Sequence, residues 1–149
     1  MAQSEGVGDF IQRALRLWGQ PLPEGDASLE LFRAVYADPV QVNGVATPVQ
    51  VLLDRARMMQ AAFDDLRHTV LETVQTPTRL AFAFRISGRH VGPLETPLGV
   101  LAPTATAVDV AGLDIFVIDE ERDRVTEIWA QADYLSLLMA AGAVARLGE

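Results

Sequence analysis

The sequence has 149 residues, a net charge of −8 at pH 7 and a hydrophobic share of 50%, which is the size and composition of one globular domain with a core of its own. It contains no cysteine and two histidines, His68 and His90, which excludes disulfide bonds, thiolate catalysis and a three-histidine zinc site. The acidic charge would repel a phosphate backbone, so we expect no nucleic-acid partner.

Two helices are predicted before residue 40. The first has an apolar face that repeats every three or four residues and ends near Gly19; its members are Phe10, Ala14, Leu17 and Trp18. The second is expected to begin at Asp26, a favoured N-cap residue, and to carry Phe32 on its apolar face. A short strand over residues 40–42 is expected to follow.

A third helix is predicted from a local pattern at residues 47–50. Threonine at position 47 is a favoured N-cap, and Pro48 fits the first helical position. Gln50, three residues after Thr47, completes the pattern of a capping box. We therefore expect a helix that begins at Pro48 and runs to about Ala62.

Beyond residues 63–65 the period of the sequence becomes that of strands. Strands are predicted over 69–74, 79–90, 104–118 and 125–130, with turns at 76–78 and 119–124 and a loop rich in Gly and Pro at 92–99. Residues 104–118 are apolar almost throughout, so we expect both faces of that strand to be buried. Asp133 is expected to cap a closing helix that carries Leu137, Leu138 and Met139.

This order of elements, with helices first and long strands later, predicts an α+β domain. A strongly bent, mostly antiparallel sheet wrapped around N-terminal helices leaves a cone-shaped space, the default position of a ligand pocket. No linker or repeat is visible, so residues 1–149 are taken as a single domain.

No targeting or membrane segment is visible in the sequence. The chain begins without a basic segment followed by an apolar run, so no secretory signal is expected. The longest apolar stretch, 134–145, has about a dozen residues and is too short to cross a bilayer. We expect a cytoplasmic protein that does not bind membranes.

Several short motifs narrow the choice of fold. They are Tyr36-Ala37-Asp38, Ala62-Phe63-Asp64-Asp65-Leu66-Arg67, Gly88-Arg89-His90-Val91-Gly92, Pro97-Leu98-Gly99, Gly112-Leu113-Asp114-Ile115-Phe116 and Glu127-Ile128-Trp129. Their order and spacing over about 10–144 resemble those of the SnoaL-like polyketide cyclases, a branch of the nuclear-transport-factor-2-like fold. Two positions at which this family usually carries histidine are Ile128 and Asn43 here, which predicts a less polar cavity.

The resemblance implies a cone-shaped domain that cyclises a hydrophobic small molecule, such as a polyketide, by an intramolecular aldol-type reaction. It implies acid/base chemistry with no cofactor and no metal, and a homodimer paired through the outer face of the sheet. Two alternatives stay open, because one fold hosts many functions. They are an isomerase or hydrolase on the same scaffold, and a non-catalytic small-molecule-binding or stress-related protein.

Asp114 is the first candidate catalytic residue. It lies inside the most apolar strand, where a carboxylate is costly unless it is paired or faces a wet cavity. An apolar site raises the pKa of a carboxyl group and lets it transfer a proton near neutrality. The alternative is a structural aspartate bonded to Arg85 or Trp18.

His90 is the second candidate catalytic residue, since imidazole titrates near physiological pH and could act as a helper base. Its alternative is a structural histidine bonded to the backbone of the loop at Gly92. Arg85 is a candidate for ligand binding, or for a pair with a buried acid such as Glu127.

The remaining candidates would bind the ligand. Asn43 could donate to a ligand carbonyl, although Asn43-Gly44 is also a turn signal. Four large side chains could form the walls of the pocket, or could equally be plain core; they are Trp18, Met58, Phe63 and Trp129. His68 has no motif around it and is expected at the surface.

Overall fold

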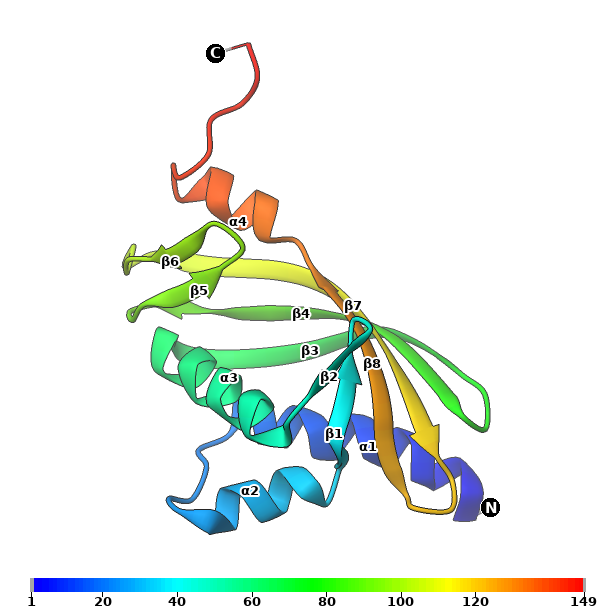
Figure 1. Cartoon of the computed structure of the whole chain (residues 1–149). Helices are drawn as coiled ribbons and strands as arrows, with labels where there is room; N and C mark the ends of the chain where they lie inside the picture. The colour runs from blue at the N-terminus through cyan, green and yellow to red at the C-terminus, as the bar shows by residue number, and fades with distance from the viewer. Residues whose placement is uncertain (1, 149) are drawn as a thin grey trace.

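A bent sheet with three helices on its concave face makes up most of the chain (Figure 1). The computed structural model describes the backbone of residues 2–148 and the side chains of residues 10–148. Within these residues the helices are α1 (Ala2–Gly19), α2 (Asp26–Arg33), α3 (Val49–Ala62) and α4 (Tyr134–Ala140). The strands are β1 (Tyr36–Val42), β2 (Val45–Thr47), β3 (Phe63–Gln75), β4 (Arg79–His90), β5 (Leu94–Thr96), β6 (Gly99–Leu101), β7 (Ala107–Asp119) and β8 (Arg124–Ala132).

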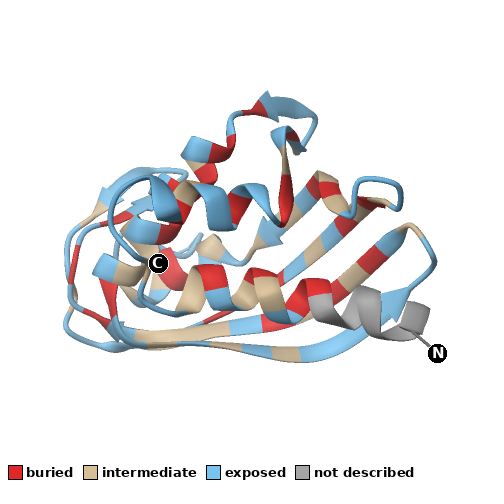
Figure 2. Ribbon diagram, turned by 90° about the horizontal axis from the view of Figure 1, so that it is seen from below, coloured by how far each residue is buried: buried red, intermediate tan, exposed pale blue. Residues whose placement is uncertain are grey.

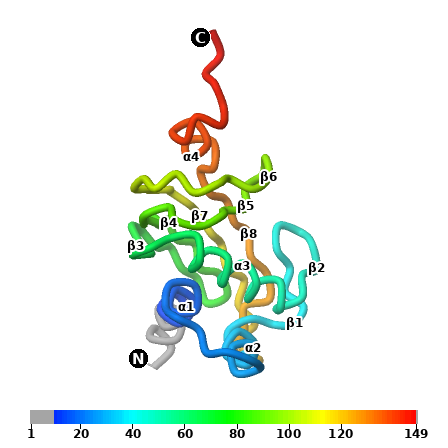
Figure 3. The backbone as a smooth tube through the Cα atoms, turned by 90° about the vertical axis from the view of Figure 1, so that its left-hand side faces the viewer, coloured from blue at the N-terminus to red at the C-terminus, as the bar shows by residue number. Residues whose placement is uncertain are grey.

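The main sheet has the strand order β2-β1-β8-β7-β4-β3, and β5 pairs with β6 in a separate hairpin. Its neighbouring strands are antiparallel except for β1 and β8, which run parallel. The predicted α+β architecture is therefore confirmed. Helix α4 lies at the opposite end of the molecule from α2 (Figure 3). None of the described helices is long and apolar enough to cross a membrane.

The core lies between the helices and the inner face of the sheet. Alternate residues of β4 point inward, so that Leu80, Phe82 and Phe84 are buried. Figure 2 shows the same alternation of buried and exposed residues along the strands. Phe82 packs edge-on against Phe116 of β7, with ring centroids 5.1 Å apart. Each such buried aromatic side chain contributes roughly 2–3 kcal/mol of transfer free energy.

A glycine on β7 makes room for one of these rings. Gly112 pairs directly with Phe84 across the β4–β7 ladder. A Cβ atom at Gly112 would lie 2.5 Å from the Cζ atom of Phe84, closer than any real contact. The Phe84 ring therefore occupies the space that a side chain at position 112 would take.

The expectation that β7 is buried on both faces is wrong for the single chain. Its inner residues, such as Phe116, are buried, but Leu113 is 63% exposed and Ile115 is 41% exposed. The helices cover only the concave face, and consecutive strand residues point to opposite faces. The apolar residues of β7 therefore divide between the buried inner face and the exposed outer face of the sheet.

The start of α3 also differs from the prediction. Pro48 is the N-cap and no side-chain cap is formed, so the expected capping box is wrong. The Thr47 hydroxyl donates instead to the carbonyl of Val45 at 2.9 Å. The backbone N–H of Val49 donates to the Asp38 carboxylate at 3.1 Å. A residue eleven positions upstream thus satisfies a donor of the first turn.

Other element boundaries differ by a few residues. Helix α2 has its N-cap at Gly25, one residue before the expected Asp26. The third strand begins at Phe63 instead of residue 69, and the hairpin of β5 and β6 occupies most of the predicted loop at 92–99 and extends to Leu101. Asp133 caps α4 as expected, because its carboxylate accepts from the backbone N–H of Ser136 at 3.1 Å.

We predict that Asp38→Ala lowers the free energy of unfolding by about 1 kcal/mol, because α3 loses a carboxylate acceptor at its first turn. Gln50→Ala should change it by less than about 0.5 kcal/mol, since the Gln50 side chain bonds to Asp54 on the surface. Chemical denaturation of the two variants beside the wild type measures both effects. A larger loss of stability for Gln50→Ala than for Asp38→Ala would contradict this prediction and would indicate that the capping box forms.

Candidate functional site

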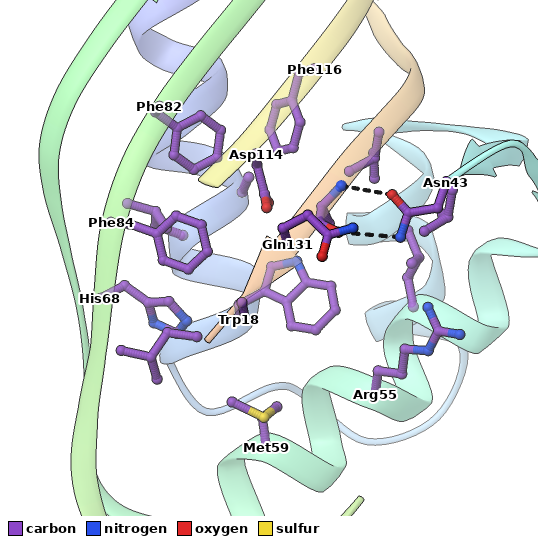
Figure 4. A pocket seen from close by; sticks show the side chains of 18 of the residues that line it. Trp18, Asn43, Arg55, Met59, His68, Phe82, Phe84, Asp114, Phe116 and Gln131 are labelled. Carbon is purple, nitrogen blue, oxygen red and sulfur yellow. Dashed lines mark hydrogen bonds between the residues drawn. The ribbon is translucent and has the colours of Figure 1, made fainter. Parts of the chain in front are cut away.

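A cavity of about 370 Å³ lies between the inner face of the sheet and helices α1 and α3 (Figure 4). Its walls are mostly apolar and aromatic, with rings from Trp18, Phe82, Phe84 and Phe116. The polar side chains that line it come from seven strands and helices and from the β1–β2 turn; they are Tyr36, Asn43, Arg55, His68, Glu95, Asp114, Gln131 and Tyr134. Such a cavity, apolar with a few polar groups, is typical of small-molecule sites.

Asp114 is the acidic residue at the centre of this wall. On β7 it pairs with Phe82 of β4 on one side and with Ala130 of β8 on the other. Desolvation by these apolar neighbours raises the pKa of its carboxyl group to about 7. Near neutral pH, Asp114 is therefore present in both the acid and the base form.

The structural pairs that could have explained Asp114 are not formed. Arg85 binds Asp109 at 3.1 Å on the exposed face of the sheet, and it pairs with neither Asp114 nor Glu127. The indole N–H of Trp18 donates to the hydroxyl of Tyr36 at 3.1 Å. Among the described side chains, none forms a hydrogen bond or an ion pair with Asp114. Its carboxyl group is thus left to interact with a bound molecule.

Tyr36 places a phenol on the same wall. Its side chain is 2% exposed, and burial raises its pKa, with a further contribution from the charge of Asp114. Because its oxygen accepts the indole N–H of Trp18, the hydroxyl is held in one position. Tyr36 therefore stays protonated throughout the physiological range.

Asn43 lines the cavity but its amide is engaged by the backbone. Its Nδ2 donates to the carbonyl of Ala130 at 3.2 Å, and its Oδ1 accepts from the N–H of Ala130 at 2.9 Å. Asn43 has φ 50° and begins the turn with Gly44 that joins β1 to β2. The residue ties this turn to β8, as a turn signal would predict.

His90 lies outside this cavity. Its ring is fully buried, and Nδ1 accepts from the backbone N–H of Thr104 at 3.2 Å and lies 3.1 Å from the Thr104 hydroxyl. The ring packs on Phe63 at 5.6 Å, beside a separate hollow of about 290 Å³ next to α4. The structure thus separates His90 from Asp114 and gives it a partner other than the loop at Gly92.

The other predicted binding residues divide into two groups. Trp18 and Met58 line the cavity. Phe63 lies in a second core cluster with Leu94 and Leu137, outside the cavity. Trp129 is 46% exposed on the outer face of β8, because its neighbours on either side point inward. Arg85 is on that outer face as well.

Sequence analysis missed His68, which was expected at the surface. It pairs with Ile86 of β4, lies on the inner face of β3 and lines the cavity. The signal was the alternation of His68 with Val70, but bulges between Asp64 and Arg67 and between Val70 and Glu72 interrupt it. Among the described residues, no three His, Asp or Glu side chains lie together as metal ligands.

Solved structures with the same fold cover nearly the whole chain. TsrD from Streptomyces laurentii has a TM-score of 0.76 at 19% identity, over 94% of this chain and 97% of that one. A SnoaL-like polyketide cyclase from Agrobacterium tumefaciens has a TM-score of 0.70 at 15% identity, over 90% and 96%. IdmH from Streptomyces antibioticus has a TM-score of 0.66 at 21% identity, over 93% and 99%. A comparison with curated protein sequences found no match.

The bent sheet and the helices on its concave face form the nuclear-transport-factor-2-like fold, which these solved structures share. Within that class, the model of the SnoaL-like polyketide cyclase family matches residues 14–141. The chain belongs to this family, and the resemblance noted from its motifs is confirmed. Ile128 and Asn43, the two positions at which the resemblance led us to expect histidine, both line the cavity.

We predict that Asp114 makes the protein less stable as pH rises. Between pH 4 and 7 the unfolded chain releases this proton while the folded chain keeps it, because the pKa is 3.8 in one state and about 7 in the other. The stability from protonated Asp114 is fully present below pH 4 and is lost as pH rises through 7.

Asp114→Asn removes this titration. As pH rises from 4 to 8, the unfolding free energy of the variant minus that of the wild type should therefore increase by up to about 4 kcal/mol. Asp109→Asn, on the exposed face, is the matched control and should show no such trend. Parallel curves for wild type and Asp114→Asn would contradict the raised pKa.

Proposed function

We propose that this protein catalyses an intramolecular aldol-type cyclisation of a hydrophobic small molecule, such as a polyketide. The observation that carries the proposal is the carboxyl group of Asp114, which lies in an apolar cavity, bonds to none of the described side chains and has a pKa of about 7. A group with that pKa suits proton transfer at neutral pH in both directions.

The proposed reaction begins at a carbon next to a carbonyl group of the ligand. The carboxylate of Asp114 removes a proton from this carbon, and the C–H electron pair forms the enolate. The enolate carbon then attacks a second carbonyl of the same molecule, and the new alkoxide takes the proton back from Asp114. Protons and electrons balance within the ligand and one carboxyl group, so the reaction needs no cofactor.

The reaction also requires that the ligand is held in a folded conformation, and the walls of the cavity can do this. Its volume of about 370 Å³ lies within the usual range for small-molecule sites. Trp18, Met58 and the three phenylalanine rings offer flat and flexible apolar contacts. When the cavity holds a flexible chain with its two reacting carbons in contact, the entropy cost of bringing them together is met on binding, so the barrier to ring closure is lower.

We predict that Asp114→Asn lowers the rate of ring closure by about a hundredfold or more, since it removes the proton-transfer group and keeps its shape. The assay substrate is an aryl diketone in which three carbon atoms separate the two carbonyl carbons. Its ring closure and dehydration give a conjugated cyclohexenone, which absorbs in the ultraviolet. Asp109→Asn is the control and should keep full activity. Full turnover by Asp114→Asn would remove this residue from the reaction.

A non-catalytic binding protein is the second candidate function. It is favoured by Ile128 and Asn43, which line the cavity where the family usually has histidines and which offer no titratable group. Saturable binding of the diketone by the wild type with no product over the uncatalysed rate would support this function and overturn the first.

We further propose that two copies pair through the outer face of the sheet. Exposed apolar side chains lie on this face on β3, β7 and β8; they are Val74, Leu113, Ile115 and Trp129. Covering them with the same face of a second copy would remove an apolar patch that a soluble monomer rarely leaves open.

Leu113→Glu should therefore convert the dimer to a monomer in light scattering, because it places a charge in the paired face. Leu98→Glu is the control, since Leu98 is 68% exposed in the β5–β6 hairpin, away from that face. A monomeric wild type would contradict the pairing.

A further inference from the structure

The imidazole ring of His68 lies on the wall of the same cavity as Asp114 (Figure 4). Its strand, β3, is the edge of the main sheet, and the cross-strand partner Ile86 also lines the cavity. No acid/base or binding role has so far been assigned to this ring. The environment of the His68 ring determines which of its nitrogens can contact a ligand.

The two ring nitrogens of His68 have different environments. Nδ1 is completely buried and has no hydrogen-bond partner among the described residues. It lies against the end of α1, where a Cβ atom on Gly19 would be only 3.2 Å from it. Because Nδ1 is closed off by the helix, Nε2 is the nitrogen that remains to meet a bound molecule.

The same contact decides where the proton of the ring resides. A buried N–H without an acceptor is rarer and more costly in proteins than an unpaired acceptor atom. Nδ1 has no acceptor within reach, so the proton belongs on Nε2, where a ligand or water accepts it. Burial also lowers the pKa of His68, which keeps the ring neutral at physiological pH.

Enolate formation needs a donor at the ligand's carbonyl oxygen, and two other polar groups of the cavity, Asn43 and Tyr36, are less suited to supply it. The Asn43 amide already bonds both backbone atoms of Ala130. Tyr36 is 2% exposed and is anchored by Trp18. His68 combines an unpartnered ring with a place on the cavity wall.

We propose that His68 polarises the carbonyl group of the ligand, by donating its Nε2–H to the oxygen while Asp114 removes the proton from the adjacent carbon. The carbonyl π electrons move to this oxygen as the C–H pair forms the carbon–carbon double bond. When the new C–C bond forms, the carbonyl is restored and the proton on Asp114 passes to the new alkoxide. The assignment deepens the proposed cyclisation and rests on it.

A neutral imidazole suits this task. An imidazolium would hold the enolate as a tight ion pair, whereas a neutral N–H stabilises the developing charge and releases it when the carbon attacks. The ring also lies close to the end of α1, since a Cβ atom at Gly19 would be only 3.2 Å from Nδ1. A preorganised donor needs no reorganisation in the transition state.

The direct test is the infrared carbonyl stretch of acetophenone with an isotope-labelled carbonyl, bound to the protein. In the wild type the stretch should move to lower frequency than in a non-polar solvent. His68→Phe should lose most of that shift, and His68→Gln should keep part of it, since an amide N–H can donate. Tyr36→Phe and Asp114→Asn should keep it.

A second variant displaces the ring without removing it. Gly19→Ala places a methyl group about 3.2 Å from Nδ1, so it should weaken the carbonyl shift although His68 is present. With the aryl diketone, His68→Phe should lower kcat by about a hundredfold and leave KM little changed. Circular dichroism and denaturation confirm that each variant is folded.

The outcomes separate the two proposals. A shift that is lost or weakened only in the His68 and Gly19 variants, with no turnover in the wild type, supports the donor and overturns the cyclisation. Turnover that needs Asp114, with a carbonyl shift unchanged in His68→Phe, overturns the donor and supports the cyclisation. Loss of the shift in Tyr36→Phe, or a wild type that binds the ketone without any shift, also overturns the role of His68.

Discussion

The carboxyl group of Asp114 faces an apolar cavity, and this placement constrains the rest of the molecule. Ionising it there costs about 4 kcal/mol more than ionising it in water, a large part of the stability of a domain this size. The aromatic packing around it, such as Phe82 on Phe116, must offset that cost. The site exists because the sheet is bent enough to leave a space that the core does not fill.

The elements and the position of Asp114 could be predicted from the sequence, because both depend on local patterns. Periods of three to four and of two residues indicated helices and strands, and a charge in the most apolar strand indicated either a cavity or a structural pair. What could not be predicted is which face of each strand is inward where bulges shift the register. His68 precedes such a bulge, and its inward direction follows only from its pairing with Ile86.

The hydrogen-bond partners of polar side chains also could not be predicted from the sequence, because these bonds join residues that are distant along the chain. Asp38 reaches the first turn of α3, and Asn43 reaches β8, through folding of the whole chain. Large apolar residues were misplaced for a related reason. Phe63 and Trp129 are apolar enough for a ligand wall, but one lies in a second core and the other on the opposite face of the sheet.

The positions of the two tryptophans have a practical consequence. Trp18 lines the cavity, donates its N–H to Tyr36 and lies within 6.3 Å of the Phe32 ring. Trp129 lies half exposed on the far side of the sheet. The chain therefore carries two natural fluorophores on opposite sides of one layer. Removing either by mutation leaves an emission signal that reports separately on ligand entry or on events at the outer surface.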